Sequence, residues 1–422
     1  MFDARKFFRI IVGVVLSVAI GAGLMIFVYA LPNERVVKNI QADLSLYARE
    51  DIAPKWGRSE HSHLDYFTEA IMLDEASHPV DGVVRTAMLN PRYRFTDGER
   101  PVEVLIQTMN GDMSGVEEVF YSRYWHGYLT VLKPLLMLFK VNHLRMLLSY
   151  AVFITFVVAL ISCQKILGTA HALAFAAVAM VLNLVSVSLS FQYQTVYFIT
   201  VAAMIIMLKK NRRLQDDGRY PEFFAAVGIM IAFFDFLTYP IFSVSMLLVL
   251  WHVLNPSSRP LKSMGSLLMA WGVGYGGMWS GKWIVSDILT GHGTIASAVN
   301  QVSTYVLLND TLSNQNWDIT LLSAIRRNVS TFGDGPIKIF LFVAIILFVR
   351  FLFKHRHIIT RRLSLPYLLP ATLPFVWYAA ISGHSHIHAF FTYRSLAATL
   401  FALTCMVIEI LSEDSFRRRR DD

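Results

Sequence analysis

The sequence contains few charged residues and only two cysteines, and each shortage excludes a class of protein. Of 422 residues, 16% are charged and 55% are hydrophobic, and the mean hydropathy is +0.48. This composition is too apolar for a soluble protein of two or three domains and predicts a polytopic membrane protein. Cys163 and Cys405 both lie in apolar segments, which argues against a disulfide framework and a CxxC metal or redox site.

The net charge of +8 does not indicate nucleic-acid binding, because the basic residues stand in short clusters between apolar runs. Such clusters set the orientation of membrane helices. We place the basic N-terminus and the clusters at 209–219, 350–362 and 417–420 in the cytoplasm. The prediction is a multi-pass protein of the bacterial cytoplasmic (inner) membrane with both termini cytoplasmic. The polar region 31–124, the Asp235 turn and the segment 382–394 then lie on the outer face.

The apolar runs predict an all-α fold with about ten to eleven transmembrane or re-entrant helices. Residues 1–30 form an uncleaved anchor helix, and residues 31–124 form an outer-face, mostly helical lobe with amphipathic helices. Residues 125–412 form a transmembrane bundle with an outer loop at 290–335, followed by a basic cytoplasmic tail at 413–422. No internal repeat is visible, which counts against a transporter built from inverted halves.

The segment 165–193 resists a simple count of crossings. An even number of spans between Lys140 and Lys209 would put either the lobe or the basic cluster on the wrong side, so we expect a re-entrant hairpin or two half-helices there. Irregular backbone at membrane depth is tolerated only against protein or a water-filled cavity. The sequence therefore predicts a cavity near residues 186–194.

Acidic residues in the lobe are the first candidates for chemistry. In "HSHLDYFTEAIMLDEA", Asp65 and Glu69 are four positions apart and share one face of a helix, beside Tyr66 and Phe67. This face could hold a carboxylate base over an apolar surface on which a sugar stacks. The alternative is a solvated amphipathic helix that lies on the bilayer.

Further candidates flank the predicted helices. In "YSRYWHGYLTVLKPLL", Arg123, Tyr124 and His126 precede a span; aromatic residues there also suit a membrane belt, whereas an outer arginine suits a phosphate. Asp235 interrupts an apolar run, and an acid at membrane depth faces a cavity or a partner such as an arginine.

The segment "SGHSHIHAFFTYR" carries His384, His386, His388, Tyr393 and Arg394. An extended backbone would point the three imidazoles to one side, as a metal site requires, whereas a helix would bring only His384 and His388 together. Three interpretations stay open: a divalent metal site, hydrogen bonding to an anionic or sugar ligand, and an inert polar bend. No cofactor is firmly predicted.

Together, the basic start, the single anchor, the long outer loop with its acidic helix, the "RYWHGY" entry and the late outer turn resemble the GT-C superfamily of membrane glycosyltransferases. The resemblance implies a polyprenyl-phosphate sugar donor and hexosyl or pentosyl transfer to a glycan, lipid or polymer acceptor of the cell envelope. It also implies that Asp65, with Glu69 as the competing candidate, is the base that deprotonates the acceptor.

The same resemblance assigns the leaving phosphate to Arg394, together with Arg123 or one of Arg92 and Arg94. The three histidines would orient phosphate or sugar hydroxyls. Other classes stay open at this point: a transporter or flippase of envelope precursors, a noncatalytic membrane partner in envelope assembly, and an acyl or phosphoryl transferase that uses the outer histidines as bases. The partners expected are the lipid-linked donor, the acceptor and membrane lipids, with no nucleic acid.

Overall fold

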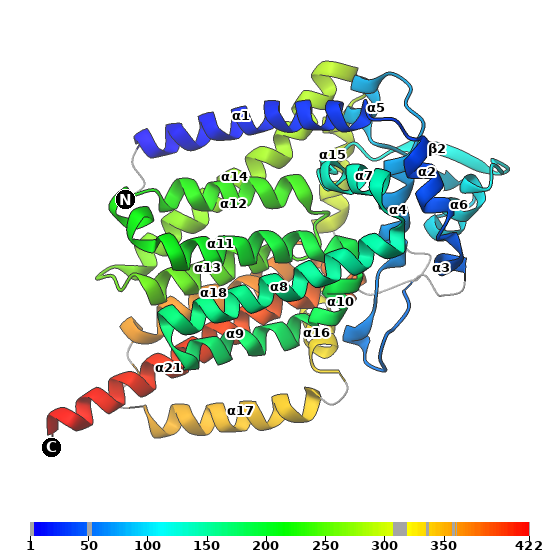
Figure 1. Ribbon diagram of the computed structural model, residues 1–422. Coiled ribbons are helices and arrows are strands. Elements are labelled where there is room, and N and C mark those ends of the chain that lie inside the picture. Colours follow the sequence, from blue (N-terminus) through cyan, green and yellow to red (C-terminus); the bar gives the residue numbers. More distant parts are fainter. Residues whose placement is uncertain are drawn as a thin grey trace.

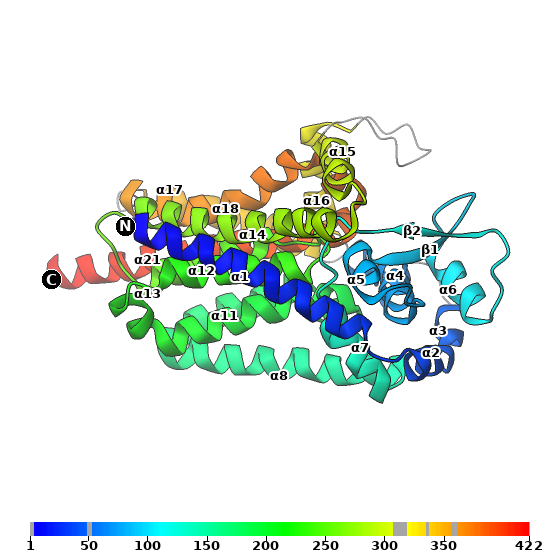
Figure 2. The ribbon, with the colours of Figure 1, turned by 90° about the horizontal axis from the view of Figure 1, so that it is seen from above.

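The computed structural model describes residues 4–48, 53–306, 319–334, 337–356, 359 and 361–421. Long helices form a bundle, and shorter elements form a lobe at one end of it (Figures 1 and 2). The bundle helices are α1 (Ala4–Tyr29), α8 (Val141–Leu167), α9 (Thr169–Leu182), α11 (Phe191–Asp216), α12 (Tyr220–Phe234), α13 (Ile241–Leu254), α14 (Pro260–Thr290), α17 (Ile337–Lys354), α18 (Arg361–Ala380) and α21 (Leu396–Asp421).

Four helices in the described ranges are long and apolar enough to cross a membrane: Ala4–Tyr29, Val141–Leu167, Phe191–Asp216 and Ala389–Phe416. Shorter apolar helices are Leu129–Leu138, Thr169–Leu182, Tyr220–Phe234 and Ile241–Leu254. A mostly helical chain with membrane-spanning character is therefore confirmed, and the count of ten to eleven spans stays a prediction. The start of α1 and the end of α21 lie at the same end of the bundle, opposite the lobe (Figure 1).

The lobe runs from Glu34 to Phe120, close to the predicted boundaries of 31–124. It contains one antiparallel pair of strands, in which Arg94 lies opposite Glu117, so it is not wholly helical. Its elements are α2 (Glu34–Gln41), α3 (Leu44–Ala48), η1 (Glu60–Ser62), α4 (Tyr66–Ser77), α5 (Val83–Leu89), β1 (Pro91–Phe95), α6 (Pro101–Met109) and β2 (Val116–Phe120).

Short helices also gather where the bundle meets the lobe: α7 (Leu129–Leu138), α10 (Leu184–Leu189), α15 (Thr294–Val306), α16 (Leu321–Phe332), α19 (Ser382–Ile387), α20 (Ala389–Thr392) and η2 (Tyr393–Ser395). The predicted outer loop 290–335 thus contains α15 and α16, while its residues 307–318 and 335 lie outside the described part. The predicted tail 413–422 continues α21 as helix to Asp421.

Of the two forms expected for 165–193, the structure shows two shorter helices and not the hairpin. The segment forms α9 and α10, separated at Asn183, which has a left-handed backbone (φ +51°) and caps α10 by accepting a hydrogen bond from the Ser186 amide. Helix α9 packs along α8 and α21, whereas the short α7 packs on α1, α2 and α4 beside the lobe. Helix α7 therefore does not run along the bundle. Three helices, α8, α9 and α11, lead from the lobe end to the basic cluster at 209–219, so the cluster lies at the end opposite the lobe (Figure 1).

Two glycines allow α12 and α14 to touch through their backbones. A Cβ built on Gly274 would lie 2.1 Å from the Ala225 carbonyl oxygen, and one built on Gly228 would lie 2.3 Å from that of Trp271. Small residues at such crossings let membrane helices approach closely. Because backbone atoms cannot move aside as a side chain can, any added methyl group must push the two helices apart.

Gly274→Ala is expected to lower the free energy of unfolding by about 1–3 kcal/mol, the usual range for overpacking. Gly272 is the matched control in the same helix, since a Cβ there meets nothing within 4 Å. Gly272→Ala should change stability by less than about 1 kcal/mol. Thermal unfolding of the purified protein in detergent measures both, and equal effects would contradict the close crossing.

Candidate functional site

A cavity of about 450 Å³, lined by both polar and apolar side chains, lies where the lobe meets α8 and α10. We call it the lobe cavity. It combines two cations with two aromatic side chains, and its lining residues are Pro54, Lys55, Trp56, Leu64, Tyr66, Arg145 and Leu189. The Trp56 indole is half-exposed and donates its N–H to Ser186 Oγ at 2.9 Å. Aromatic faces and cations are the groups that bind sugars and phosphates, so this cavity suits a polar, anionic ligand.

The Arg145 guanidinium forms the rear of the lobe cavity and is paired with Glu69 of α4. Its Nη1 donates to the Tyr66 hydroxyl at 3.2 Å and its Nη2 to the Tyr47 hydroxyl at 3.3 Å. The Tyr47 hydroxyl in turn donates to Glu69 Oε1 at 2.5 Å. Glu69, predicted as a catalytic candidate, therefore holds Arg145 in place and is itself fully buried.

Asp65 is the N-cap of α4 and lies between two residues of the cavity wall, Leu64 and Tyr66. Its carboxylate accepts hydrogen bonds from the Thr68 amide and hydroxyl, both at 2.9 Å, and from the Gln192 side-chain amide. Burial raises the pKa of Asp65 above its ordinary value, and the hydrogen bonds from Thr68 and Gln192 oppose this shift only in part. A carboxyl with a raised pKa has the character of a general base.

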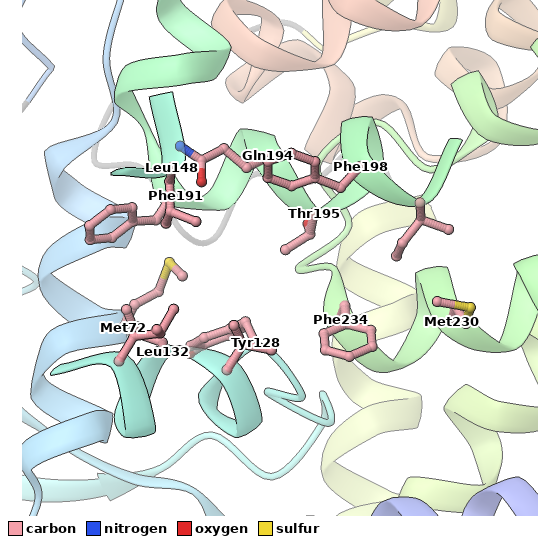
Figure 3. Close-up of a pocket in the computed structure, with 13 residues that line it drawn as sticks. Met72, Tyr128, Leu132, Leu148, Phe191, Gln194, Thr195, Phe198, Met230 and Phe234 are labelled. Carbon is pink, nitrogen blue, oxygen red and sulfur yellow. The ribbon is translucent and has the colours of Figure 1, made fainter. Parts of the chain in front are cut away.

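A second hollow, which we call the apolar groove, lies among α4, α7, α8, α11 and α12 and has a volume of about 240 Å³. In Figure 3, side chains of α11 face those of α7 across it, with Met72 of α4 at one side and Phe234 of α12 at the other. Its lining residues are Met72, Tyr128, Val131, Leu132, Leu135, Leu148, Phe191, Gln194, Thr195, Phe198, Ile199, Met230 and Phe234. Such a lining suits hydrocarbon. Together with the lobe cavity at Leu189, it places hollows beside residues 189–194, within the region where a cavity was predicted.

The two hollows are neighbours, because three segments of the chain contribute lining residues to both of them. One residue of each segment faces the lobe cavity and another, two to six positions further on, faces the apolar groove. The pairs are Tyr66 and Met72 on α4, Arg145 and Leu148 on α8, and Leu189 at the end of α10 with Phe191 at the start of α11. A molecule with a polar head and a hydrocarbon tail matches this combination.

Several other predicted residues surround the loop between α12 and α13. Phe236 of this loop packs against Tyr124 and His126, with ring centroids 6.0 and 4.9 Å apart. Asp235 accepts hydrogen bonds from the Thr238 amide and hydroxyl, so it closes its own loop, and it pairs with no arginine among the residues that the structure describes. His126 adopts a left-handed backbone (φ +54°) and its Nδ1 lies 2.8 Å from Glu75 Oε2.

The histidine segment is helical, so it brings His384 and His388 together, with ring centroids 4.6 Å apart, and turns His386 away toward Ser323. The His384 Nε2 lies 2.9 Å from the Leu237 carbonyl oxygen. Within the described ranges, no group of three or more His, Cys, Asp or Glu residues has the geometry of a metal site. His384 therefore connects α19 to the loop between α12 and α13, and His386 connects it to α16.

Arg394 is fully buried, which places it in the interior and not at the lip of a cavity. Its Nε and Nη1 donate to the carbonyl oxygens of Leu182 and Phe390, both at 3.0 Å, and its guanidinium lies 4.0 Å from the centre of the Tyr193 ring. The Tyr393 hydroxyl donates to the His61 carbonyl at 3.3 Å. Arg394 and Asp65 approach the same short stretch of α11, at Tyr193 and Gln192, but neither lines the lobe cavity.

The remaining arginines lie apart from both hollows. Arg92 forms two hydrogen bonds with Glu99, at 3.0 and 2.8 Å, and Arg94 donates to Glu117 at 2.7 Å, all on the sheet of the lobe. Arg123 contacts Ser297 of α15 at 3.4 Å. The structure therefore does not bring these three together with Asp65.

His78, at the end of α4, makes the lobe sensitive to pH. Its Nε2 lies 2.9 Å from Glu118 Oε2 and its Nδ1 lies 3.8 Å from Asp74 Oδ1. Burial lowers the pKa of His78, but the carboxylates of Asp74 and Glu118 outweigh it, and the pKa is raised overall. The stabilisation that protonated His78 gives the folded lobe is thus complete below the ordinary histidine pKa of about 6.5. It is lost as the pH rises through the raised pKa of His78.

Raising the pH from about 6 to about 9 should therefore lower the stability of the lobe through His78, because the protonated form that Asp74 and Glu118 stabilise is lost. His78→Gln should flatten this part of the pH profile, measured as the thermal unfolding midpoint of the full chain. His292→Gln, a change at an exposed histidine, should leave the slope as it is. An unchanged slope in His78→Gln would contradict the assignment.

Sequence reasoning missed Arg145, Lys55 and Trp56, which line the lobe cavity. For Arg145 a signal was present, because it is a cation inside the apolar run of α8, and charges in such runs are costly unless they are paired or functional. Lys55 and Trp56 stand in a short irregular segment without periodicity, so no pattern marked them.

Comparison with protein families, with curated proteins and with solved structures finds no match to this chain. The interpretation of the site therefore rests on its geometry.

Proposed function

We propose that this chain is a membrane glycosyltransferase that transfers a sugar from a polyprenyl-phosphate donor to a cell-envelope acceptor. One observation supports this above all: the lobe cavity, with its two cations, and the apolar groove share three wall segments. A polyprenyl-phosphate sugar has a hydrocarbon tail that suits the groove and a polar head that suits the cavity. The proposal includes about ten to eleven spans, cytoplasmic termini and an outer-face lobe.

In the proposed reaction, Asp65 is the general base. The acceptor hydroxyl oxygen forms a bond to the anomeric carbon of the donor sugar, and its proton passes to the Asp65 carboxylate. The bond between that carbon and the phosphate oxygen breaks, and its electron pair leaves with the lipid phosphate. Because Gln192 and Thr68 close off the carboxylate in this structure, acceptor binding has to displace Gln192 from it.

The proposal is tested by transfer of a labelled sugar from polyprenyl phosphate to membrane acceptors. The purified chain is reconstituted in vesicles with hexosyl and pentosyl polyprenyl phosphates in separate assays. The expected result is labelled acceptor and released polyprenyl phosphate in equal amounts. If no lipid-linked donor supports transfer, the proposal fails and the transporter and assembly-factor alternatives take its place.

A further inference from the structure

We propose that Arg145 is the phosphate ligand of the lobe cavity and that it binds the phosphate of a lipid phosphate, with Lys55 as the second cation. The proposal deepens the proposed function and rests on it for the identity of the lipid. It moves the phosphate role from Arg394, where sequence reasoning placed it, to a residue that lines the cavity.

The first support is a donor without a partner. Arg145 is 7% exposed, and its Nε has no hydrogen-bond partner among the described residues. A guanidinium carries five N–H donors, and Glu69, Tyr47 and Tyr66 do not use all of them. A buried donor without a partner is costly, so an oxyanion that reaches it gains more than it would at the surface.

The second support is that Arg145 is fixed before any ligand arrives. Its guanidinium carbon lies 4.9 Å from the Tyr66 ring centre, 5.8 Å from that of Tyr47 and 6.0 Å from that of Phe191. Glu69 holds one side of the same group. A side chain that is already ordered loses little conformational entropy on binding, which favours affinity.

The third support is the depth at which Arg145 lies. Leu148, one turn further along α8, and Phe191, against which the guanidinium packs, both line the apolar groove. In a lipid phosphate, the phosphate is the group that joins the hydrocarbon tail to the polar head. Arg145 stands at the corresponding boundary between the groove and the cavity, whereas Lys55, paired with Glu60 at 2.5 Å, stands on the lobe side.

Arg394 shares the first two features, because its Nη2 also has no hydrogen-bond partner among the described residues and its guanidinium also packs on an aromatic ring, that of Tyr193. It lacks the third, which is a position at the boundary between the two hollows. Two of its nitrogens already donate to backbone carbonyl oxygens, its exposure is 0%, and it lines neither hollow. Its contacts join α9, α11 and η2, which is a packing role.

The test compares binding of farnesyl phosphate, farnesol and inorganic phosphate to the full chain in detergent. Arg145→Gln alone leaves the Glu69 carboxylate buried without its partner, so the informative variant is Arg145→Gln with Glu69→Gln, which keeps the pair neutral and hydrogen-bonded. Arg145→Lys, which keeps the charge but not the planar donors, should recover part of the affinity. Arg100→Gln, on the lobe surface and paired with Asp97, is the control.

Wild type is expected to bind farnesyl phosphate at least about tenfold more tightly than farnesol, as a charge-assisted hydrogen bond implies. The double variant should bind the two equally, while Lys55→Gln should lose a smaller part of the preference and Arg100→Gln none. A full preference in the double variant would overturn the assignment of Arg145. Equal affinity for inorganic phosphate and farnesyl phosphate would contradict the proposal that the bound phosphate belongs to a lipid.

This experiment separates the two proposals. Arg145-dependent binding of farnesyl phosphate without sugar transfer from any lipid-linked donor would keep the phosphate site and reject the transferase. Sugar transfer that persists in the double variant, with an undiminished preference for the phosphate, would keep the transferase and reject Arg145.

Discussion

Asp65→Asn is expected to lower the rate of sugar transfer by about 10²- to 10⁴-fold, the usual contribution of a positioned general base. The substitution removes the proton acceptor but keeps the local fold. Asparagine caps helix N-termini about as well as aspartate, so the amide of Thr68 retains its partner and α4 still begins at Tyr66. A loss of activity without a loss of stability would therefore indicate chemistry and not folding.

One further variant and the pH dependence of the wild type extend this test. Asp65→Ala removes both the base and the cap, so it should lose activity and also about 1 kcal/mol of stability. In wild type, transfer should decline as the pH falls through the raised pKa of Asp65, because only the ionised carboxylate accepts a proton. Unchanged transfer in Asp65→Asn would place the base elsewhere.

The sequence predicted those features that depend on contacts between residues a few positions apart in the chain. The four-residue spacing of Asp65 and Glu69 indicated a helix, and the structure begins α4 one residue after Asp65. The alternation of His384, His386 and His388 allowed two outcomes, and the helix at Ser382–Ile387 selects the one that pairs the first and third. In both cases, the spacing of nearby residues in the sequence was enough to predict which side chains share one side of a helix.

Features that depend on distant contacts could not be predicted in this way. Glu69 and Arg145 are 76 positions apart, and only tertiary packing brings them together. Helices α7 and α9 are both short and apolar, so composition could not tell which of them runs along the bundle. Arg394 looked like a surface ligand because it follows polar residues, but its burial depends on the carbonyl groups that α9 and α20 offer it.

The second large effect is expected at the Arg145–Glu69 pair. Arg145→Gln should lower the free energy of unfolding by about 3–5 kcal/mol, because removal of one partner leaves the fully buried Glu69 carboxylate without its counter-charge. Glu69→Gln alone should cost a similar amount, since the guanidinium is then left among the rings of Tyr47, Tyr66 and Phe191 without an acid.

The double variant, Arg145→Gln with Glu69→Gln, distinguishes a paired charge from two independent contacts. Because neither buried charge remains, we expect it to be more stable than either single variant, which requires a coupling energy larger than the loss in either single variant. Unfolding of all four proteins in the same detergent gives this energy directly. Additive losses would mean that the two residues stabilise the lobe separately. Strong coupling would mean that Glu69 is committed to holding Arg145, which leaves Asp65 as the carboxylate available for proton transfer.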